Sequence, residues 1–212
     1  MGINDCVGDV IVKILRQCDV RPGDVLVCYS AQMRSEDPVE GSGYSHVAIA
    51  LDAPELLESN SAGVAISTLT KLLESYDHVA VIRADLWDTD RIAALKEFAS
   101  QSVGKPFDIV GKKQRPTLQE EATILAVDRA KAYFDGNAPP VPSNLEKYFC
   151  SQLVHAAFMQ VGIVGSAAQI MRPESRSPMD LATDKVYGFF CGYLVPYPDY
   201  QVPADDRFLT NI

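Results

Sequence analysis

One cysteine of the chain lies where it could act as a nucleophile. The apolar run over residues 149–161 predicts a helix, and Cys150 stands at its start, in the segment Tyr148-Phe149-Cys150-Ser151-Gln152-Leu153-Val154. A thiol attacks as the thiolate, and a helix N-terminus and a nearby imidazolium both lower its pKa. Backbone N–H groups at the helix start could also hold an oxyanion formed during attack. The alternative is that Cys150 is a small buried hydrophobe, as most isolated cysteines are.

The other four cysteines are more easily explained by packing. Cys28 and Cys191 lie in strand-like apolar runs, whereas Cys6 and Cys18 lie on a predicted amphipathic helix over residues 3–18. The five cysteines are widely scattered and form no paired C-x-x-C spacing, which indicates neither a zinc site nor a disulfide framework. We therefore expect reduced thiols, no metal and no cofactor.

A catalytic cysteine needs a base, and the sequence offers three histidines. His155 follows Cys150 by five positions, about 500° of helical rotation, so it lies off the same helix face. His46 and His78 both open predicted strands, in the similar strings Ser45-His46-Val47-Ala48-Ile49-Ala50 and Asp77-His78-Val79-Ala80-Val81-Ile82. The local pattern does not choose between these two.

A third polar group is needed to orient the imidazole and to favour its charged form. Glu58 is the candidate, because it lies on a predicted strand that follows His46. If strands 46–51 and 56–59 pair as a tight hairpin, the carboxylate can reach the histidine on the same sheet face. The alternative is a solvated glutamate near a turn.

The elements that must position these residues are strands in one run, with helices beside and after them. Strands are predicted at 24–30, 46–51, 56–59, 63–66, 78–84 and 186–195, and helices at 3–18, 67–75, 88–104, 117–134, 149–161 and from 177 onward. Residues 31–45 are predicted to be a polar loop. Neither a regular βαβ alternation nor an internal repeat is present. The fold class is therefore α+β, with a mainly antiparallel sheet packed against helices.

Length and charge bound the remaining possibilities. The 212 residues, 47% of them apolar, predict a single domain over 1–212. The net charge of -9 argues against a nucleic-acid partner. No Sec-type signal peptide and no apolar run long enough for a transmembrane segment is found, so we expect a cytoplasmic protein, or one exported without a cleavable signal peptide as a secreted effector. The oligomeric state is left open.

Six motifs, taken in order, point to a family. They are Pro22-Gly23-Asp24-Val25-Leu26, Ser45-His46-Val47-Ala48-Ile49, Leu57-Glu58-Ser59 with Gly63-Val64, Gly104-Lys105-Pro106-Phe107-Asp108, Phe149-Cys150-Ser151-Gln152-Leu153-Val154, and Ser177-Pro178-Met179-Asp180-Leu181. Together they resemble the YiiX-like branch of the circularly permuted NlpC/papain-like superfamily of cysteine hydrolases, over residues 22 to about 195. The resemblance implies a permuted papain-like topology with the catalytic cysteine at a helix N-terminus.

The same resemblance implies roles for three residues. It makes Cys150 the nucleophile, His46 the base and Glu58 the orienting group, and it leaves His78 on a strand without a catalytic residue. Many relatives carry Glu where this chain has Gln152, which weakens any role for a carboxylate there. A helical and Pro-rich insertion at about 112–147 is a candidate lid or substrate-binding elaboration.

Three functions are consistent with this sequence. The resemblance favours a cysteine-dependent amide hydrolase, a peptidase or amidase that works through an acyl-enzyme, with cell-wall peptides such as peptidoglycan stems among its substrates. The branch is also similar to lecithin retinol acyltransferase-like proteins, so a lipid-directed thiol hydrolase or acyltransferase is the second. The third is a non-catalytic binding module of the same fold. The expected partner is accordingly a peptide or an acyl substrate.

Overall fold

A six-stranded antiparallel sheet organises the chain. The computed structural model describes residues 12–36, 42–142, 144–165, 170 and 172–210. Neighbouring strands follow the order β4-β3-β2-β1-β5-β6. Their bounds are β1 Val25–Tyr29, β2 Tyr44–Ala50, β3 Glu55–Asn60, β4 Gly63–Thr68, β5 His78–Arg83 and β6 Phe189–Leu194. Every predicted strand is present, which confirms the α+β class with a mainly antiparallel sheet.

Eight α-helices are present in the described part of the chain. They are α1 Ala31–Glu36, α2 Leu69–Ser75, α3 Thr89–Ser102, α4 Ile109–Ile124, α5 Ala126–Phe134, α6 Cys150–Gln160, α7 Pro178–Thr183 and α8 Arg207–Thr210, with single 3-10 turns at Gln17–Asp19, Pro173–Ser175 and Lys185–Tyr187. None of the helices in the described part of the chain is long and apolar enough to cross a membrane.

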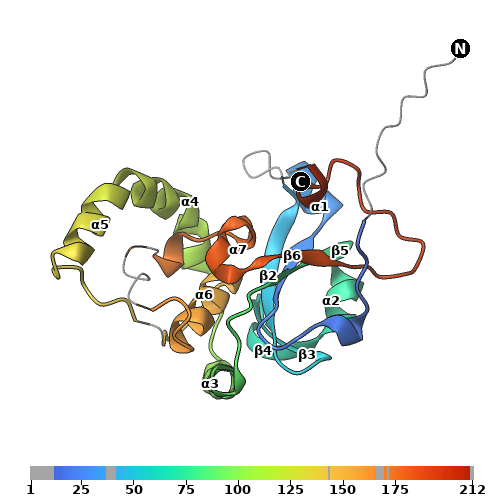
Figure 1. Ribbon diagram of the computed structural model, residues 1–212. Coiled ribbons are helices and arrows are strands. Elements are labelled where there is room, and N and C mark those ends of the chain that lie inside the picture. Colours follow the sequence, from blue (N-terminus) through green and yellow to red (C-terminus); the bar gives the residue numbers. More distant parts are fainter. Residues whose placement is uncertain (1–11, 37–41, 143, 166–169, 171, 211–212) are drawn as a thin grey trace, which may run out of the picture.

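The two faces of the sheet bury different apolar clusters. Side chains alternate along each strand, so Val27 and Val47 point to one face while Leu26 and Ala48 point to the other. The first face packs against α3, α6 and α7, and the second against α2. Figure 1 shows α2 on the opposite side of the sheet from α3 and α6. Helix α6 therefore packs against the apolar face of the sheet that contains Val27 and Val47.

Strands β2 and β3 are joined over only part of their length. Their pairing is confined to Ile49 with Leu57 and Ala50 with Leu56, next to the turn between them. On its other side β2 pairs with β1 along the whole strand, whereas β3 pairs fully with β4. The outer halves of β2 and β3 thus leave a seam in the sheet.

Several local predictions were wrong for identifiable reasons. The predicted loop over 31–45 begins with helix α1, whose first N–H, that of Ala31, is donated to Asp77 Oδ2 at 2.7 Å. The predicted helix at 117–134 is instead α4, capped by Asp108 and containing Pro116, followed by α5. Of the predicted helix 3–18, residues 3–11 lie outside the described residues. Its described part contains Ile14, which forms a parallel bridge with Tyr193, and only a 3-10 turn.

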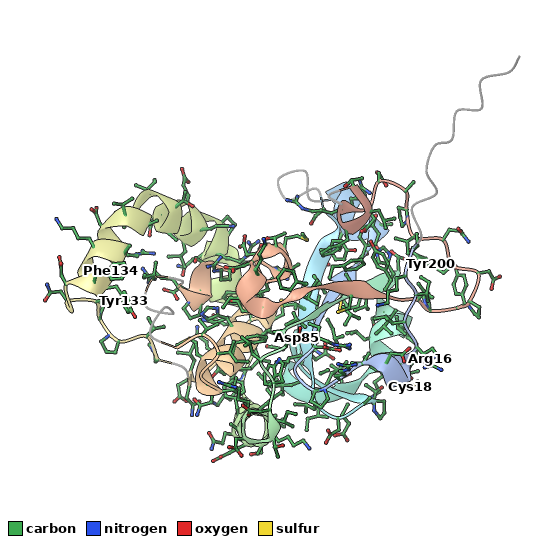
Figure 2. The ribbon with its side chains drawn as sticks, in the orientation of Figure 1. Arg16, Cys18, Asp85, Tyr133, Phe134 and Tyr200 are labelled. Carbon is green, nitrogen blue, oxygen red and sulfur yellow. The ribbon has the colours of Figure 1, made fainter. Side chains whose placement is uncertain are left out.

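The predicted insertion at 112–147 contains most of α4, all of α5 and a proline-rich return segment. Figure 1 shows α4 and α5 extending away from the sheet, and Figure 2 shows Tyr133 and Phe134 at the far end of α5. The Phe134 side chain is 81% exposed. The division of the chain into one domain with this insertion stays a prediction.

Candidate active site

Helix α6 presents Cys150 at its first position. The cap residue, Phe149, has an extended backbone and carries no side-chain acceptor for the first-turn N–H groups. By contrast, Ser177 at the cap of α7 accepts the N–H of Asp180. The cap of α6 therefore provides no side-chain acceptor for the N–H groups of the first turn, which begins at Cys150.

The residue two positions before Cys150 is fixed from three sides. The carbonyl of Tyr148 accepts hydrogen bonds from Ser59 Oγ at 2.7 Å and from the N–H of Asp108 at 3.0 Å. The N–H of Tyr148 is donated to the carbonyl of Pro106 at 3.2 Å. The segment before the nucleophile candidate is thus tied both to β3 and to the Gly104–Asp108 motif.

His46 lies between a carboxylate and the thiol. Its Nε2 is 2.8 Å from Glu58 Oε2, and its ring also forms a side-chain hydrogen bond with Cys150. The ring of Tyr76, from the end of α2, stacks on the imidazole with centroids 5.4 Å apart and an interplanar angle of 1°. Tyr76 thus contacts the face of the His46 ring, and Glu58 fixes its orientation through Nε2.

The seam between β2 and β3 accommodates this arrangement. Because the outer halves of the two strands are not paired with each other, the N–H of Val47 is free to donate to the Cys150 sulfur. The expected tight hairpin between the strands carrying His46 and Glu58 exists only near its turn. The carboxylate nevertheless reaches the histidine, as predicted.

The charges of the three groups support one another. Burial disfavours the charged imidazole, but the hydrogen bonds with Cys150 and Glu58 outweigh it and raise the pKa of His46 to about 9. Burial also opposes ionisation of Glu58, yet the hydrogen bond from His46 holds the pKa of the carboxyl below its usual value. Side-chain hydrogen bonds from Ser67 and Asn60 act in the same direction.

The thiol is poised to ionise. Burial alone would raise the pKa of Cys150, but the hydrogen bond and the charge of His46 lower it below the ordinary value. The charge of Lys112, on α4, and the N–H of Val47 add to this effect. Both shifts, up for His46 and down for Cys150, favour a thiolate–imidazolium pair over the neutral pair.

Comparison with known protein families agrees with this geometry. Residues 19–116 match the model of a family described as permuted papain-like amidase enzyme, YaeF/YiiX, C92 family. The resemblance to the YiiX-like branch is confirmed. The match supports a cysteine-type hydrolase in general. It contains His46 and Glu58 and ends before Cys150. No curated protein and no solved structure gives a significant match.

The other two histidines are bonded to groups other than Cys150. His155 is fully buried and bonds through Nδ1 to the hydroxyl of Tyr187, and burial lowers its pKa to about 3. His78 is fully buried and bonds to Tyr44, Tyr200 and Asp206. The structure thus brings together Cys150, His46 and Glu58, whereas their catalytic roles stay predictions.

Sequence reasoning missed the residues that surround the three. Tyr76, Asn60, Ser67 and Lys112 reach the site through tertiary contacts, and no local motif marks them. Ser59, by contrast, directly follows Glu58 in a quoted motif and could have been found by its alternation to the opposite sheet face. Within the described ranges, no group of three or more His, Cys, Asp or Glu side chains could hold a metal ion.

Proposed function

We propose that the protein is a cysteine-dependent amide hydrolase in which Cys150 is the nucleophile, His46 the base and Glu58 the orienting group. The observation that carries the proposal is the unbroken chain of contacts from carboxylate to imidazole to sulfur at a helix N-terminus. That combination of groups is the one that activates a thiol for acyl transfer.

The chemistry follows from these positions. The Cys150 thiolate attacks the carbonyl carbon of an amide, and the C=O π electrons move to the oxygen. N–H groups of the first turn of α6, that of Cys150 among them, stabilise the oxyanion. The imidazolium of His46 protonates the leaving amine as the C–N bond breaks. The neutral imidazole then takes a proton from water as its oxygen attacks the thioester carbonyl. The C–S bond breaks, the carboxylic acid leaves, and the thiolate–imidazolium pair is restored.

The surroundings of the site favour a polar substrate over an acyl chain. A pocket of about 480 Å³ opens beside Glu58 and Tyr76. Its remaining lining includes four hydroxyl or amide side chains and a lysine, namely Asn60, Ser61, Ser67, Ser75 and Lys71. Peptides match such a surface through their backbone polar groups, whereas a fatty-acyl chain would leave these groups without partners. This supports the peptidase or amidase interpretation over the lipid-directed one.

Selective alkylation tests the nucleophile without knowledge of the substrate. At pH 6, iodoacetamide should label Cys150 ahead of Cys18, although Cys18 is exposed and Cys150 is buried. Peptide mass spectrometry identifies the labelled cysteine, and Cys150→Ala with its matched control Cys18→Ser separates the two signals. Faster labelling of Cys18 at that pH would contradict an activated Cys150 and favour a non-catalytic module.

A substrate comparison tests the reaction. Purified protein is incubated with peptidoglycan stem peptides, with fluorogenic peptide amides and with phospholipid vesicles, each against Cys150→Ala. We expect Cys150-dependent release of an amine from a peptide or an amide, and none of fatty acid from the vesicles. Fatty-acid release alone would overturn the amidase assignment. Lysis of bacteria by periplasmic but not cytoplasmic expression of the wild type would support peptidoglycan and an exported protein.

A further inference from the structure

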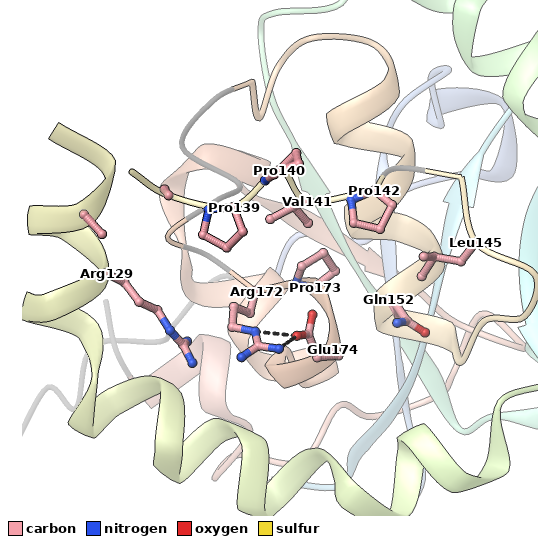
Figure 3. Close-up of a pocket in the computed structure, with 12 residues that line it drawn as sticks. Arg129, Pro139, Pro140, Val141, Pro142, Leu145, Gln152, Arg172, Pro173 and Glu174 are labelled. Atoms are coloured by element: carbon pink, nitrogen blue, oxygen red, sulfur yellow. Dashed lines mark hydrogen bonds and ion pairs between the residues drawn. The ribbon is translucent and has the colours of Figure 1, made fainter. Parts of the chain in front are cut away.

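A second pocket lies where the predicted insertion meets helix α6. It has a volume of about 400 Å³ and is lined by α5, the proline-rich segment 138–142, the first turn of α6 and the turn that contains Arg172 and Glu174. Figure 3 shows Arg129 on one side of the pocket and Gln152 on the other, with the prolines across the top. The pocket thus joins the insertion to the helix that carries Cys150.

Two polar atoms in this pocket are buried without a partner. The Gln152 side chain is only 6% exposed, and its Oε1 has no hydrogen-bond partner among the described residues. The Nη1 atom of Arg129 is also buried and has no hydrogen-bond partner among the described residues. Buried polar atoms are nearly always satisfied, so the Gln152 carbonyl oxygen and one guanidinium nitrogen of Arg129, both on the lining of this pocket, indicate a missing ligand.

The charge of the pocket defines the ligand further. Arg172 donates a hydrogen bond from Nε to Glu174 and forms an ion pair with it through Nη2, so the acidic group of the pocket is already engaged (Figure 3). With Arg129 the pocket carries two cations and one anion, and burial together with the charge of Arg172 lowers the pKa of Arg129. A second anion would relieve the repulsion between the two guanidinium groups.

The remaining wall is apolar. Pro139, Pro140, Val141, Pro142 and Leu145 line the side between the two polar atoms. A ligand for this pocket must therefore combine an anionic oxygen, an N–H donor and an apolar group within a few bonds of one another.

We propose that this pocket binds the C-terminal residue of a peptide. Its carboxylate lies on Arg129, its amide N–H is donated to Gln152, and its apolar side chain packs against the proline wall. This inference deepens the proposed function and rests on it for the role of the site, since it names peptides with a free carboxylate as the substrate class. Binding itself needs no working nucleophile.

A matched pair of small ligands tests the inference. N-acetyl-leucine and N-acetyl-leucinamide differ only in the carboxylate, and both are titrated into the full-length Cys150→Ala protein by calorimetry and ¹H–¹⁵N NMR. We expect the acid to bind and to shift the side-chain amide signal of Gln152, and the amide to bind about tenfold more weakly.

Three variants locate the contact. Arg129→Met and Gln152→Met should each weaken binding of the acid about tenfold. Lys131→Met, which removes an exposed cation from the same helix, should leave it unchanged. Because Gln152 is buried, Arg129→Met is the decisive variant if Gln152→Met unfolds. Equal binding of acid and amide, no binding of the acid at millimolar concentration, or undiminished binding by Arg129→Met would overturn the inference. None of these results depends on the alkylation of Cys150, so the two proposals fail separately.

Discussion

The molecule contains two buried histidine–carboxylate pairs that differ in what completes them. His46 lies in the outer half of β2 and pairs with Glu58 at 2.8 Å, whereas His78 opens β5 and lies 3.3 Å from Asp206. Both rings lie in aromatic surroundings, His46 on Tyr76 and His78 among four tyrosines. A histidine beside a carboxylate is therefore not enough to define a catalytic site in this fold.

The difference lies in the ring nitrogens. In His78, Nδ1 bonds to Tyr200, and Nε2 bonds to both Tyr44 and Asp206. Asp206 in turn accepts hydrogen bonds from Tyr193 and the N–H of Phe208, which fastens the C-terminal segment to the sheet. In His46, Nε2 is used by Glu58, which leaves Nδ1 as the nitrogen that can serve a thiol. We infer that one pair stabilises the fold and the other supports chemistry.

Substitution of each histidine by glutamine should give the largest difference in kcat/KM. His46→Gln should lower kcat/KM by about 10³-fold or more, because both the proton acceptor and the charge that stabilises the thiolate are lost. His78→Gln should leave kcat/KM of the folded protein within about threefold of wild type. Steady-state assays on an identified amide substrate measure both. The comparison breaks if His78→Gln inactivates a well-folded protein.

Loss of the carboxylate should destabilise the fold more at the His78 pair than at the His46 pair. Asp206→Ala removes a buried acceptor for several donors and should lower the free energy of unfolding by about 3 kcal/mol. Glu58 also has several donors, but it lines an open pocket where solvent can replace the lost carboxylate, so Glu58→Ala should cost less than half of that. Urea denaturation followed by circular dichroism measures the two values. Equal losses would show that both pairs are structural.

The pH profile should report the catalytic pair only. The pKa of His46 is raised to about 9, so its imidazolium persists up to that pH and activity should fall as pH rises through about 9. On the acid side, activity should fall only below the lowered pKa of Cys150. Glu58→Gln removes one cause of the raised His46 pKa, so the alkaline limb should move to lower pH. If the alkaline limb of the kcat/KM profile stays at the same pH in Glu58→Gln, Glu58 does not act on His46 as proposed.

The smallest expected effect concerns Lys112. This exposed lysine contributes a charge that lowers the pKa of Cys150 through space, so Lys112→Gln should raise that pKa and slow alkylation at pH 6 about twofold. Added salt should reduce the difference, because exposed charges are screened. Lys113→Gln is the matched control. An equal effect of both variants would show that net charge, and not position, acts on the thiol.

The sequence predicted the sheet better than its surroundings. Alternating apolar runs marked every strand, and motif order selected His46 over His78 before any distance was known. Helix α1 was missed because its first N–H is satisfied by Asp77, which lies 46 positions away. The start of α4 was placed too late because Thr117 and Glu120 have the spacing of a capping box, whereas the helix begins at Ile109 and is capped by Asp108.

The partners of the two histidines could not be predicted from local sequence patterns either. The Tyr200 and Asp206 side chains that close off His78 come from a segment more than 120 positions away, and no local pattern indicates it. The stacking of Tyr76 on His46 and the charge of Lys112 near Cys150 depend likewise on tertiary packing. Periodicity specifies which face a residue occupies, but not which distant residue meets it there.

At the seam between β2 and β3, one backbone amide of the sheet has the Cys150 sulfur as its hydrogen-bond acceptor. The N–H of Val47 is donated to Cys150, whereas the neighbouring residues Ile49 and Ala50 pair with β3. Hydrogen exchange at Val47 is therefore protected by the thiolate and not by a partner strand. If Cys150 acts as proposed, its acylation weakens that acceptor, so the exchange rate of the Val47 amide should report the covalent state of the sulfur.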